Sequence, residues 1–541
     1  MIADTAGVSL GPTAALVLVF LAYRFILHPI LLSPLAHIPN AHWSSPLSRL
    51  WILNTRWTGR ENRIRHALHR KLGPVIRLGP NELSISDINS VRTVYKGRFD
   101  KSTWYSVFDN YGAPCMFSTR GAAEHSARKR LISNVYSKSY IQSSLAALAQ
   151  AAAILHDRLL PLLEESVSEA QIPHGIDLFS IYMAATMDFI SAYIFGLGGG
   201  TDFLRNKGYR DHFLEMYKAR NDYGFYDQEL PAVTRFCRRL GIPFCPKWVD
   251  SANRELEDWC RRRCDNVAAK VSSASGLSTK LDTSDEPVVW RALVGGLEKE
   301  AKTNGSTSIL YPTALSNIRP SIASELLDHI LAGQETAGLT LSYLSWRLSK
   351  SLSLQAELRS ELRTLNPNLK TNNKPNSRQM PDPKELANLP LLHALIMETL
   401  RLHAPIPGAQ PRQTPDSGCQ IGRYQVPGGS RIAATAYSLH RDEDVFPDSE
   451  KWDHTRWLVE GEDDEEEERK KRQRQFWAFS SGGRMCVGSN FAMHEMKLMI
   501  CAIYSNYTSH IVDDSGMDQQ SDGYTGRPAH ERLFLRFEKV E

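Results

Sequence analysis

One ten-residue segment, Phe479–Gly488 (FSSGGRMCVG), restricts the fold of this chain more than any other. It carries one cysteine, Cys486, in a glycine-rich loop directly ahead of a helical pattern that starts near Asn490. Backbone N–H groups and the following helix stabilise a thiolate at such a position, so the sulfur can bind a metal. Glycines let the backbone approach a flat cofactor closely. The segment therefore predicts a fold that brings a planar, metal-containing group against this loop.

The residue types around the cysteine also suit a bound cofactor. Arg484 is placed to pair with a carboxylate of the cofactor, and Phe479 is placed to pack over its ring. Gly482 and Gly488 provide the close approach of the backbone. A glycine turn with a buried free cysteine would explain any one of these residues. The five fixed positions together favour a cofactor loop.

A possible ion pair precedes this loop. Glu398 and Arg401 lie three residues apart on the helix predicted for Leu391–His403, so they share one face. The spacing alone means little, because Glu466 and Arg469 repeat it within an acidic, solvated run. The Glu398–Arg401 pair is informative only through its position relative to the other motifs.

A third motif, Ala332–Thr336 (AGQET), lies midway along the long helical pattern Ser321–Lys350. We expect Ala332-Gly333 to interrupt this helix, since helices kink at small residues. For a lone occurrence, a plain helix-packing position would be the preferred interpretation.

The rest of the chain gives a coarse outline. Gly73–Asp87 reads as a small hairpin, and the helical spacing is clearest over Leu145–Leu163 and Ile176–Phe195. We expect a polar loop over Ser272–Ser316. Two low-complexity stretches, Asn366–Pro383 and Glu460–Gln475, are typical of solvated insertions.

The three motifs, in this order, resemble the cytochrome P-450 family. The loop matches the family's haem-binding pattern F-x-x-G-x-R-x-C-x-G position for position. The resemblance implies a mainly α fold with a smaller β region, the cytochrome P-450 fold, preceded by one N-terminal transmembrane helix. It also implies heme b (iron protoporphyrin IX) with the Cys486 thiolate as axial iron ligand.

The resemblance assigns further residues. Arg456 would join Glu398 and Arg401 in a buried structural triad. Glu335 and Thr336 would deliver, through ordered water, the protons that dioxygen cleavage needs, with Gly333 leaving room for dioxygen.

Haem carboxylates would be contacted by His125, Arg412 and the residue four positions after His125. The family has arginine at that last position and this chain has Lys129, so Lys129 or Arg128 could serve. An exposed basic helix face is the alternative interpretation of this segment.

The N-terminus predicts a membrane anchor. Val8–Leu27 is about 20 residues long, enough for one crossing. Basic residues follow the segment, so the positive-inside rule places the rest of the chain in the cytosol. We expect a single-pass protein of the endoplasmic reticulum membrane, with an anchor at 1–32 and a catalytic domain at 33–541. A buried core helix is the alternative.

Composition limits the partners. Lys plus Arg is 64 and Asp plus Glu is 60, so the net charge of +4 gives no reason to expect nucleic acid. Eight cysteines form no paired framework, which indicates a reducing compartment. The chain has no nucleotide-binding glycine loop, so its electrons must come from outside. The resemblance implies NADPH acting through a cytochrome P-450 reductase, with cytochrome b5 as an optional second donor.

The implied function is the insertion of one oxygen atom from O2 into an apolar small molecule, in natural-product (secondary-metabolite) biosynthesis. Two alternatives stay open: a haem-thiolate isomerase or dehydratase that needs no reductase, and a non-catalytic haem or ligand carrier. By the family's architecture, five segments would line the substrate pocket: Trp104–Phe117, Gly208–Phe244, Asp328–Gly333, Pro405–Ala409 and Gly523–Gly526.

Overall fold

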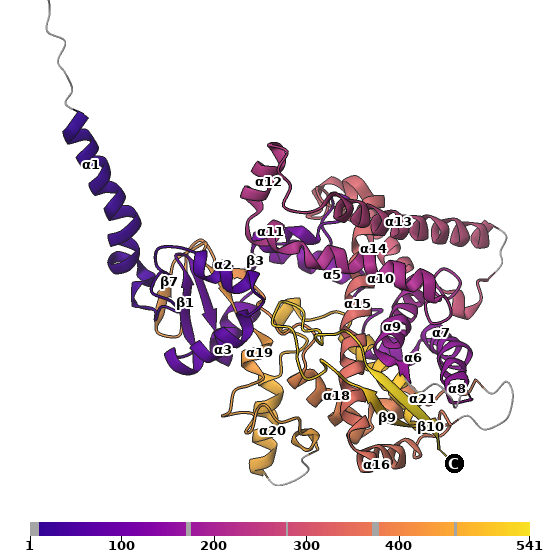
Figure 1. Cartoon of the computed structure of the whole chain (residues 1–541). Coiled ribbons are helices and arrows are strands. Elements are labelled where there is room, and N and C mark those ends of the chain that lie inside the picture. Colours follow the sequence, from indigo (N-terminus) through magenta and orange to yellow (C-terminus); the bar gives the residue numbers. More distant parts are fainter. Residues whose placement is uncertain (1–9, 169–174, 277–279, 371–377, 459–462, 541) are drawn as a thin grey trace, which may run out of the picture.

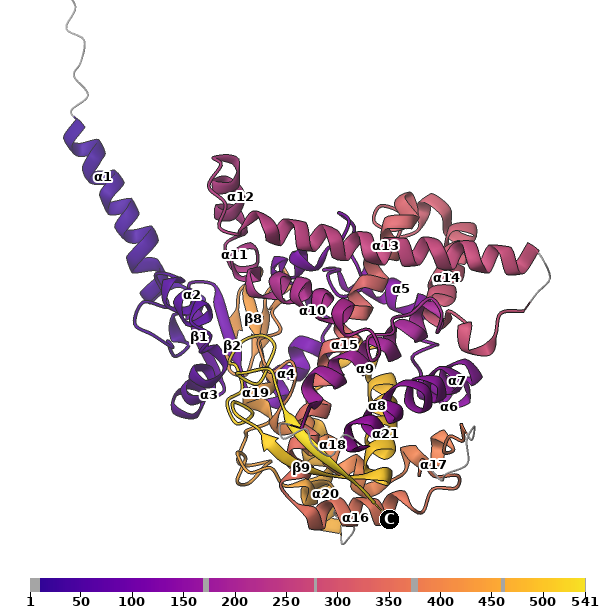
Figure 2. The same ribbon diagram turned by 45° about the vertical axis from the view of Figure 1, so that its right-hand side comes forward.

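The computed structural model describes residues 10–168, 175–276, 280–370, 378–458 and 463–540. α-Helices dominate, and the longest of those described, α15 (Ile318–Ser349), runs through the middle of the molecule (Figures 1 and 2). It packs along α9 (Leu178–Phe195), which is buried almost throughout its length. A helix that is apolar all round belongs in the core of a large protein. This pair is therefore the centre of the fold.

The remaining helices surround the pair or cover the sheets. They are α2 (Leu50–Trp57), α3 (Glu61–Leu72), α4 (Ile88–Val91), α5 (Ala122–Ile132), α6 (Lys138–Ser143), α7 (Leu145–Ile154), α8 (Leu160–Ser168), α10 (Lys207–Asp222), α11 (Gly224–Glu229), α12 (Pro231–Arg239), α13 (Lys247–Gly276), α14 (Val288–Asn304), α16 (Leu352–Leu362), α17 (Pro383–Ala387), α18 (Pro390–Leu402), α19 (Ala436–Leu439), α20 (Asp463–Gln475) and α21 (Ser489–Asn506).

Three small sheets complete the fold. A five-stranded sheet has the order β1 (Val75–Gly79), β2 (Glu82–Ile85), β8 (Arg431–Ala433), β5 (Arg412–Gln413) and β3 (Asp100–Lys101). The others are β4 (Ile176–Asp177), β10 (Phe534–Lys539) and β9 (Tyr507–Asp513), and the hairpin β6 (Cys419–Ile421) and β7 (Tyr424–Val426). Among the strands of the described residues, only β2 and β8 pair in parallel. The expected mainly helical fold with a smaller β region is confirmed.

Two expectations about helices are wrong. The stretch expected as a loop over Ser272–Ser316 contains α14, which buries Val289, Leu293 and Leu297 against the core. Helix α15 is continuous through Gly333, so no interruption is present. A Cβ on Gly333 would lie 2.7 Å from the Ile190 side chain, so glycine there permits close contact between α15 and α9.

The N-terminal helix projects from the body of the molecule (Figure 1). It consists of α1 (Leu10–Ala22) and η1 (Tyr23–Leu32). Thr13–Leu32 spans 20 residues with a mean hydropathy of 2.2, and none of it is buried. The segment is thus a candidate membrane span, and the alternative of a buried core helix does not hold for these residues. Residues 1–9 of the expected anchor lie outside the described residues, as do 371–377 and 460–462 of the two expected insertions.

Candidate active site

The cysteine loop folds back on itself just ahead of α21. The Cys486 N–H donates to the Phe479 carbonyl at 3.0 Å. Gly482 has a φ of +71°, a conformation that favours glycine, and a Cβ there would lie 2.4 Å from the Tyr95 carbonyl oxygen. Gly488 directly precedes α21, and its N–H faces the cysteine sulfur. The glycines therefore let the loop pack tightly while the cysteine stays free.

Cys486 is the one exposed cysteine among the eight, all of which are described. Its sulfur is deep in the protein but faces an open cavity. Burial raises the pKa of the Cys486 thiol, whereas the hydrogen bond from the Gly488 N–H and the nearby Lys129 lower it. Cys245 also lines the cavity, but it is buried and donates to the Tyr223 carbonyl at 3.6 Å. Cys486 is thus the cysteine available to a bound group.

The cavity has a volume of about 1040 Å³. Small-molecule sites usually occupy ~300–1,000 Å³, so a flat cofactor and a substrate fit together here. All five segments expected to line the pocket contribute to its wall. Phe479, Arg484 and Gly488 also lie on the wall, whereas Gly482 supports the loop from behind. One cavity therefore joins the cysteine loop to the expected substrate segments.

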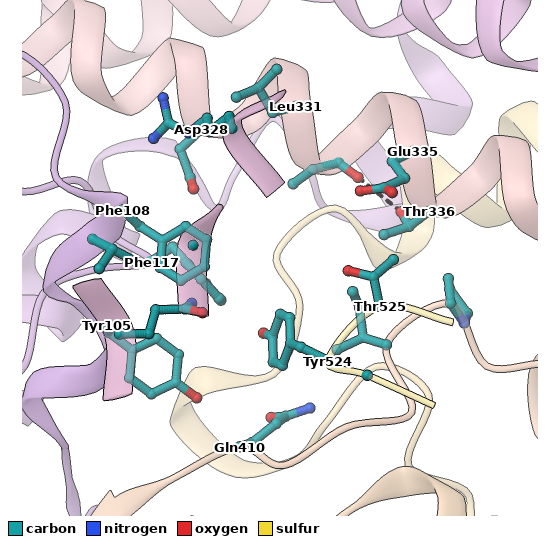
Figure 3. A pocket seen from close by; sticks show the side chains of 18 of the residues that line it. Tyr105, Phe108, Phe117, Asp328, Leu331, Glu335, Thr336, Gln410, Tyr524 and Thr525 are labelled. Carbon is teal, nitrogen blue, oxygen red and sulfur yellow. Dashed lines mark hydrogen bonds between the residues drawn. The ribbon is translucent and has the colours of Figure 1, made fainter. Parts of the chain in front are cut away.

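Glu335 and Thr336 project from α15 on this cavity (Figure 3). The Thr336 hydroxyl donates to the Ala332 carbonyl at 2.9 Å. The Glu335 carboxylate accepts hydrogen bonds from the Tyr217 hydroxyl at 2.6 Å and from Nε of Arg527 at 2.5 Å. Glu335 is therefore held by residues from α10 and from the C-terminal segment.

Four basic side chains lie together on another part of the wall: Lys101, His125, Arg412 and Arg484. Lys101 and Arg412 are direct partners in the antiparallel pairing of β3 with β5. Within the described part of the chain, none of the four forms an ion pair with a carboxylate. Like charges placed opposite each other destabilise a sheet. This basic cluster therefore needs an anionic partner.

Hydrogen bonds hold the two arginines of the cluster in place. Arg484 donates to the Thr119 carbonyl at 2.8 Å, and Arg412 donates to the Tyr105 hydroxyl at 3.1 Å. Burial and the neighbouring Arg484 lower the pKa of His125 to about 2, so its ring is neutral. Lys101 was missed by sequence reasoning, because only the fold brings it beside the other three.

Lys129 lies elsewhere than expected. It does not line the cavity, and its ammonium donates to the carbonyls of Met485 at 2.9 Å and Gly483 at 3.2 Å. Arg128 is buried and pairs with Glu124 at 3.3 Å and with Glu325 at 3.6 Å. The placement of Lys129 and Arg128 therefore does not support the expected contact with a haem carboxylate. Lys129 instead holds the cysteine loop.

The expected triad residues come together in the core. Arg401 and Glu398 are fully buried and form two hydrogen bonds, at 2.7 and 2.9 Å. Nε of Arg456 lies 3.5 Å from Glu398 Oε1, and Nε1 of Trp457 donates to Oε2 at 2.9 Å. Arg401 also donates to the carbonyls of His440 and Ser449. A buried ion pair needs such additional hydrogen bonds to offset its desolvation.

The site fits a haem. No group of three or more His, Cys, Asp or Glu side chains among the described residues could hold a metal ion. Cys486 can provide one ligand, and a metal bound there would take its other ligands from a cofactor. A porphyrin supplies them, and its two carboxylates match the unpaired basic cluster. Cys486 and the basic cluster line the same cavity.

Comparisons with known proteins agree with this geometry. The cytochrome P-450 family model matches residues 316–529. The cytochrome P-450 monooxygenase avaI of Aspergillus versicolor is 28% identical over 444 residues, which covers 79% of this chain and 94% of that protein. The cytochrome P-450 monooxygenase orf2 of Aspergillus niger is 25% identical over 523 residues, covering 94% and 92%. The cytochrome P-450 monooxygenase tazI of Aspergillus terreus is 23% identical over 530 residues, covering 96% and 95%.

Proposed function

Since this chain belongs to the cytochrome P-450 family and is a haem-thiolate monooxygenase, we propose that it hydroxylates an apolar small molecule of natural-product biosynthesis. One oxygen atom of O2 enters the substrate and the other leaves as water, with two electrons from NADPH delivered by a membrane-bound cytochrome P-450 reductase; cytochrome b5 is an optional second donor. The observation that carries this proposal is that Cys486 opens into the same cavity as Glu335 and Thr336.

Cys486 would ligate the haem iron through its thiolate, and Phe479 and Gly488 would shape the wall of the haem site beside it. When bound, the haem supplies the activation of dioxygen. Arg412, Arg484, Lys101 and the neutral His125 hold its carboxylates, because these side chains form the basic cluster and have no carboxylate partner of their own. Gly482 and Lys129 fix the loop from behind, through the Tyr95 contact and the two carbonyl hydrogen bonds.

Glu335 and Thr336 supply protons to the oxygen site. Thr336 presents a hydroxyl at the cavity, and Glu335 is a carboxylate that can exchange protons with water there. Arg527 and Tyr217 position Glu335 and are not themselves reacting groups. Glu398, Arg401 and Arg456 act as structural support, since their charged atoms contact one another and backbone carbonyls rather than the cavity.

The protein has two parts. Residues 1–32 anchor it in the endoplasmic reticulum membrane, and 33–541 form the catalytic domain on the cytosolic side. The exposed apolar surface of Thr13–Leu32 supports the anchor, and the basic residues that follow support the orientation.

The test is product formation by the full-length, haem-loaded enzyme with reductase, NADPH and isotopically labelled dioxygen. Apolar probe compounds are first selected by the shift that they cause in the Soret band. We expect one labelled oxygen atom in the product, and less product per NADPH for Glu335→Gln and Thr336→Ala. Conversion without NADPH would instead indicate an isomerase or dehydratase. Haem and probe binding without any conversion would indicate a carrier.

A further inference from the structure

A carboxylate without a partner faces the cavity from α15. Asp328 lies eight residues, or about two helical turns, before Thr336. Figure 3 shows its side chain pointing from the helix toward the open space beside Phe108 and Phe117. No residue in the described part of the chain donates a hydrogen bond to it or forms an ion pair with it. Asp328 is half-buried on the cavity wall, so its carboxylate is accessible to a cation bound in the cavity.

The charged groups around Asp328 have partners of their own. Arg220 of α10 donates to Asn110 Oδ1 at 2.7 Å. Lys101 of β3 donates to the Phe117 carbonyl. On α15 itself, Glu325 accepts from the Met116 N–H at 2.9 Å and lies 3.4 Å from His329. None of these groups neutralises Asp328 by direct contact.

Asp328 stays ionised near neutral pH. Burial raises the pKa of its carboxyl to about 6, while the nearby His329 opposes that rise and Glu325 adds to it. At pH ~7.5 the carboxylate form therefore dominates. The cavity offers a substrate one fixed negative charge at this point.

Aromatic rings surround the same space. The ring centroids of Phe108 and Phe117 are 5.0 Å apart, those of Tyr105 and Phe117 are 5.3 Å apart, and those of Trp104 and Tyr524 are 5.0 Å apart. All five residues line the cavity. Lys101 already lies over the faces of Tyr105 and Phe117, 3.9 and 3.8 Å from their ring centroids. The rings left for a bound cation are therefore those of Phe108, Trp104 and Tyr524. The faces of aromatic rings attract cations, and rings combined with a carboxylate favour an ammonium group over a neutral donor.

We propose that Asp328 and this aromatic wall bind a protonated amine of the substrate, so that the enzyme oxidises apolar amines. This inference rests on the proposed function and names its substrate class. The helix rise places Asp328 about 12 Å along α15 from Thr336. The oxidised carbon is therefore expected on the order of 10 Å from the nitrogen.

The test uses two probes of one shape and an alcohol with a smaller head group on the purified haem-loaded enzyme. They are 4-phenylbutyl-trimethylammonium, which cannot ligate iron, its uncharged tert-butyl isostere, and 4-phenylbutanol. Dissociation constants are measured by calorimetry, which needs neither turnover nor reductase. We expect the wild type to bind the ammonium probe at least as tightly as the isostere. Asp328→Asn is expected to weaken binding of the ammonium probe about ten-fold and binding of the isostere less than about two-fold.

Two variants serve as controls. Asp328→Glu keeps the charge and is expected to retain the preference, and Asp222→Asn removes an exposed carboxylate from the cavity rim and is expected to leave it unchanged. The inference would be overturned if the wild type bound the isostere more tightly than the ammonium probe. It would also be overturned if Asp328→Asn lost the same affinity for the ammonium probe as for the alcohol. The spectrum of the reduced carbon monoxide complex separates this outcome from failure of the proposed function, because it reports thiolate ligation independently of the probes.

Discussion

Nε2 of His440 accepts a hydrogen bond at 2.8 Å from the backbone N–H of Trp477, two residues ahead of the cysteine loop. Nδ1 of the same ring donates to the Arg401 carbonyl at 2.8 Å. The imidazole thus joins α18 to the loop that ends in Cys486. Burial, assisted by Arg401, lowers the pKa of His440 to about 3, so the ring is neutral in the folded protein.

Replacing His440 is expected to loosen the cysteine loop. His440→Phe leaves the Trp477 N–H and the Arg401 carbonyl without partners, and each buried unpaired group costs about 1–3 kcal/mol. We expect a lower free energy of unfolding and less haem per protein, measured by urea unfolding and by the haem absorbance of the purified protein.

The same variant tests a pH dependence. Below its usual pKa of about 6.5, His440 takes up a proton in the unfolded chain but not in the folded one, so falling pH destabilises the protein between about 6.5 and 3. The loss is at most about 1.4 kcal/mol per pH unit. The free energy of unfolding in urea should therefore differ less between pH ~7 and pH ~5 for His440→Phe than for the wild type. The other buried histidines are present in both proteins, so equal differences would contradict this account.

The two Glu–Arg pairs with the same spacing are expected to behave differently. Arg401→Ala leaves Glu398 charged and fully buried, and breaking a buried pair costs about 3–5 kcal/mol. Arg469→Ala breaks the exposed pair with Glu466, which water and salt screen, so we expect almost no loss of stability. Urea denaturation compares the two variants. Similar losses would mean that the triad does not support the fold.

The sequence could predict those parts of the site that depend on local spacing. The cysteine loop, the hairpin near Gly73, and the helices that carry Glu398 and Thr336 each follow from residues within one short stretch. Helix α14 was missed although Val289, Leu293 and Leu297 are four residues apart, because Gly295-Gly296 and a polar C-terminal half obscured the pattern.

Other features depend on contacts between distant segments. Lys101 became a candidate only when β3 was placed beside β5, which pairs it with Arg412. The role of Gly333 changed because Ile190 of α9 occupies the space that its side chain would need. Lys129 matched a family position by sequence spacing, but its ammonium reaches the loop carbonyls of Gly483 and Met485.

Lys101→Met is expected to weaken haem retention. The change removes one cation from the basic cluster, and a charged hydrogen bond to a carboxylate is worth about 1.5–3 kcal/mol. Haem loss to excess apomyoglobin, followed by absorbance, should accelerate about ten-fold or more. Lys96→Met, which removes an exposed lysine five residues earlier, is the matched control. Equal loss rates for the two variants would contradict the role of Lys101.

Glu229→Gln is expected to open the cavity. Glu229 of α11 is buried and contacts three arginines, Arg49, Arg56 and Arg431, at 2.9–3.0 Å. Burial raises the pKa of the Glu229 carboxyl, but Arg56 and Arg431 together lower it further, to about 2. Without this charge α11 should detach more readily from the β sheet.

The measurement is the association rate of 1-phenylimidazole, followed by stopped-flow absorbance of the Soret band. We expect a several-fold faster rate for Glu229→Gln, since breaking a buried pair costs about 3–5 kcal/mol. Asp227→Asn, which removes an exposed pair with Arg238 on the neighbouring helix, should leave the rate unchanged. An unchanged rate in Glu229→Gln would show that α11 does not control access.

The most direct test of the central claim is the carbon monoxide difference spectrum of the reduced protein, wild type against Cys486→Ser. Thiolate ligation gives a red-shifted Soret band, and Cys486 is the exposed cysteine on the cavity wall. We predict this band for the wild type and its loss in Cys486→Ser, with the helical content unchanged by circular dichroism. A folded, haem-loaded wild type without the band, or a variant that keeps it, would contradict the assignment of Cys486 as the iron ligand.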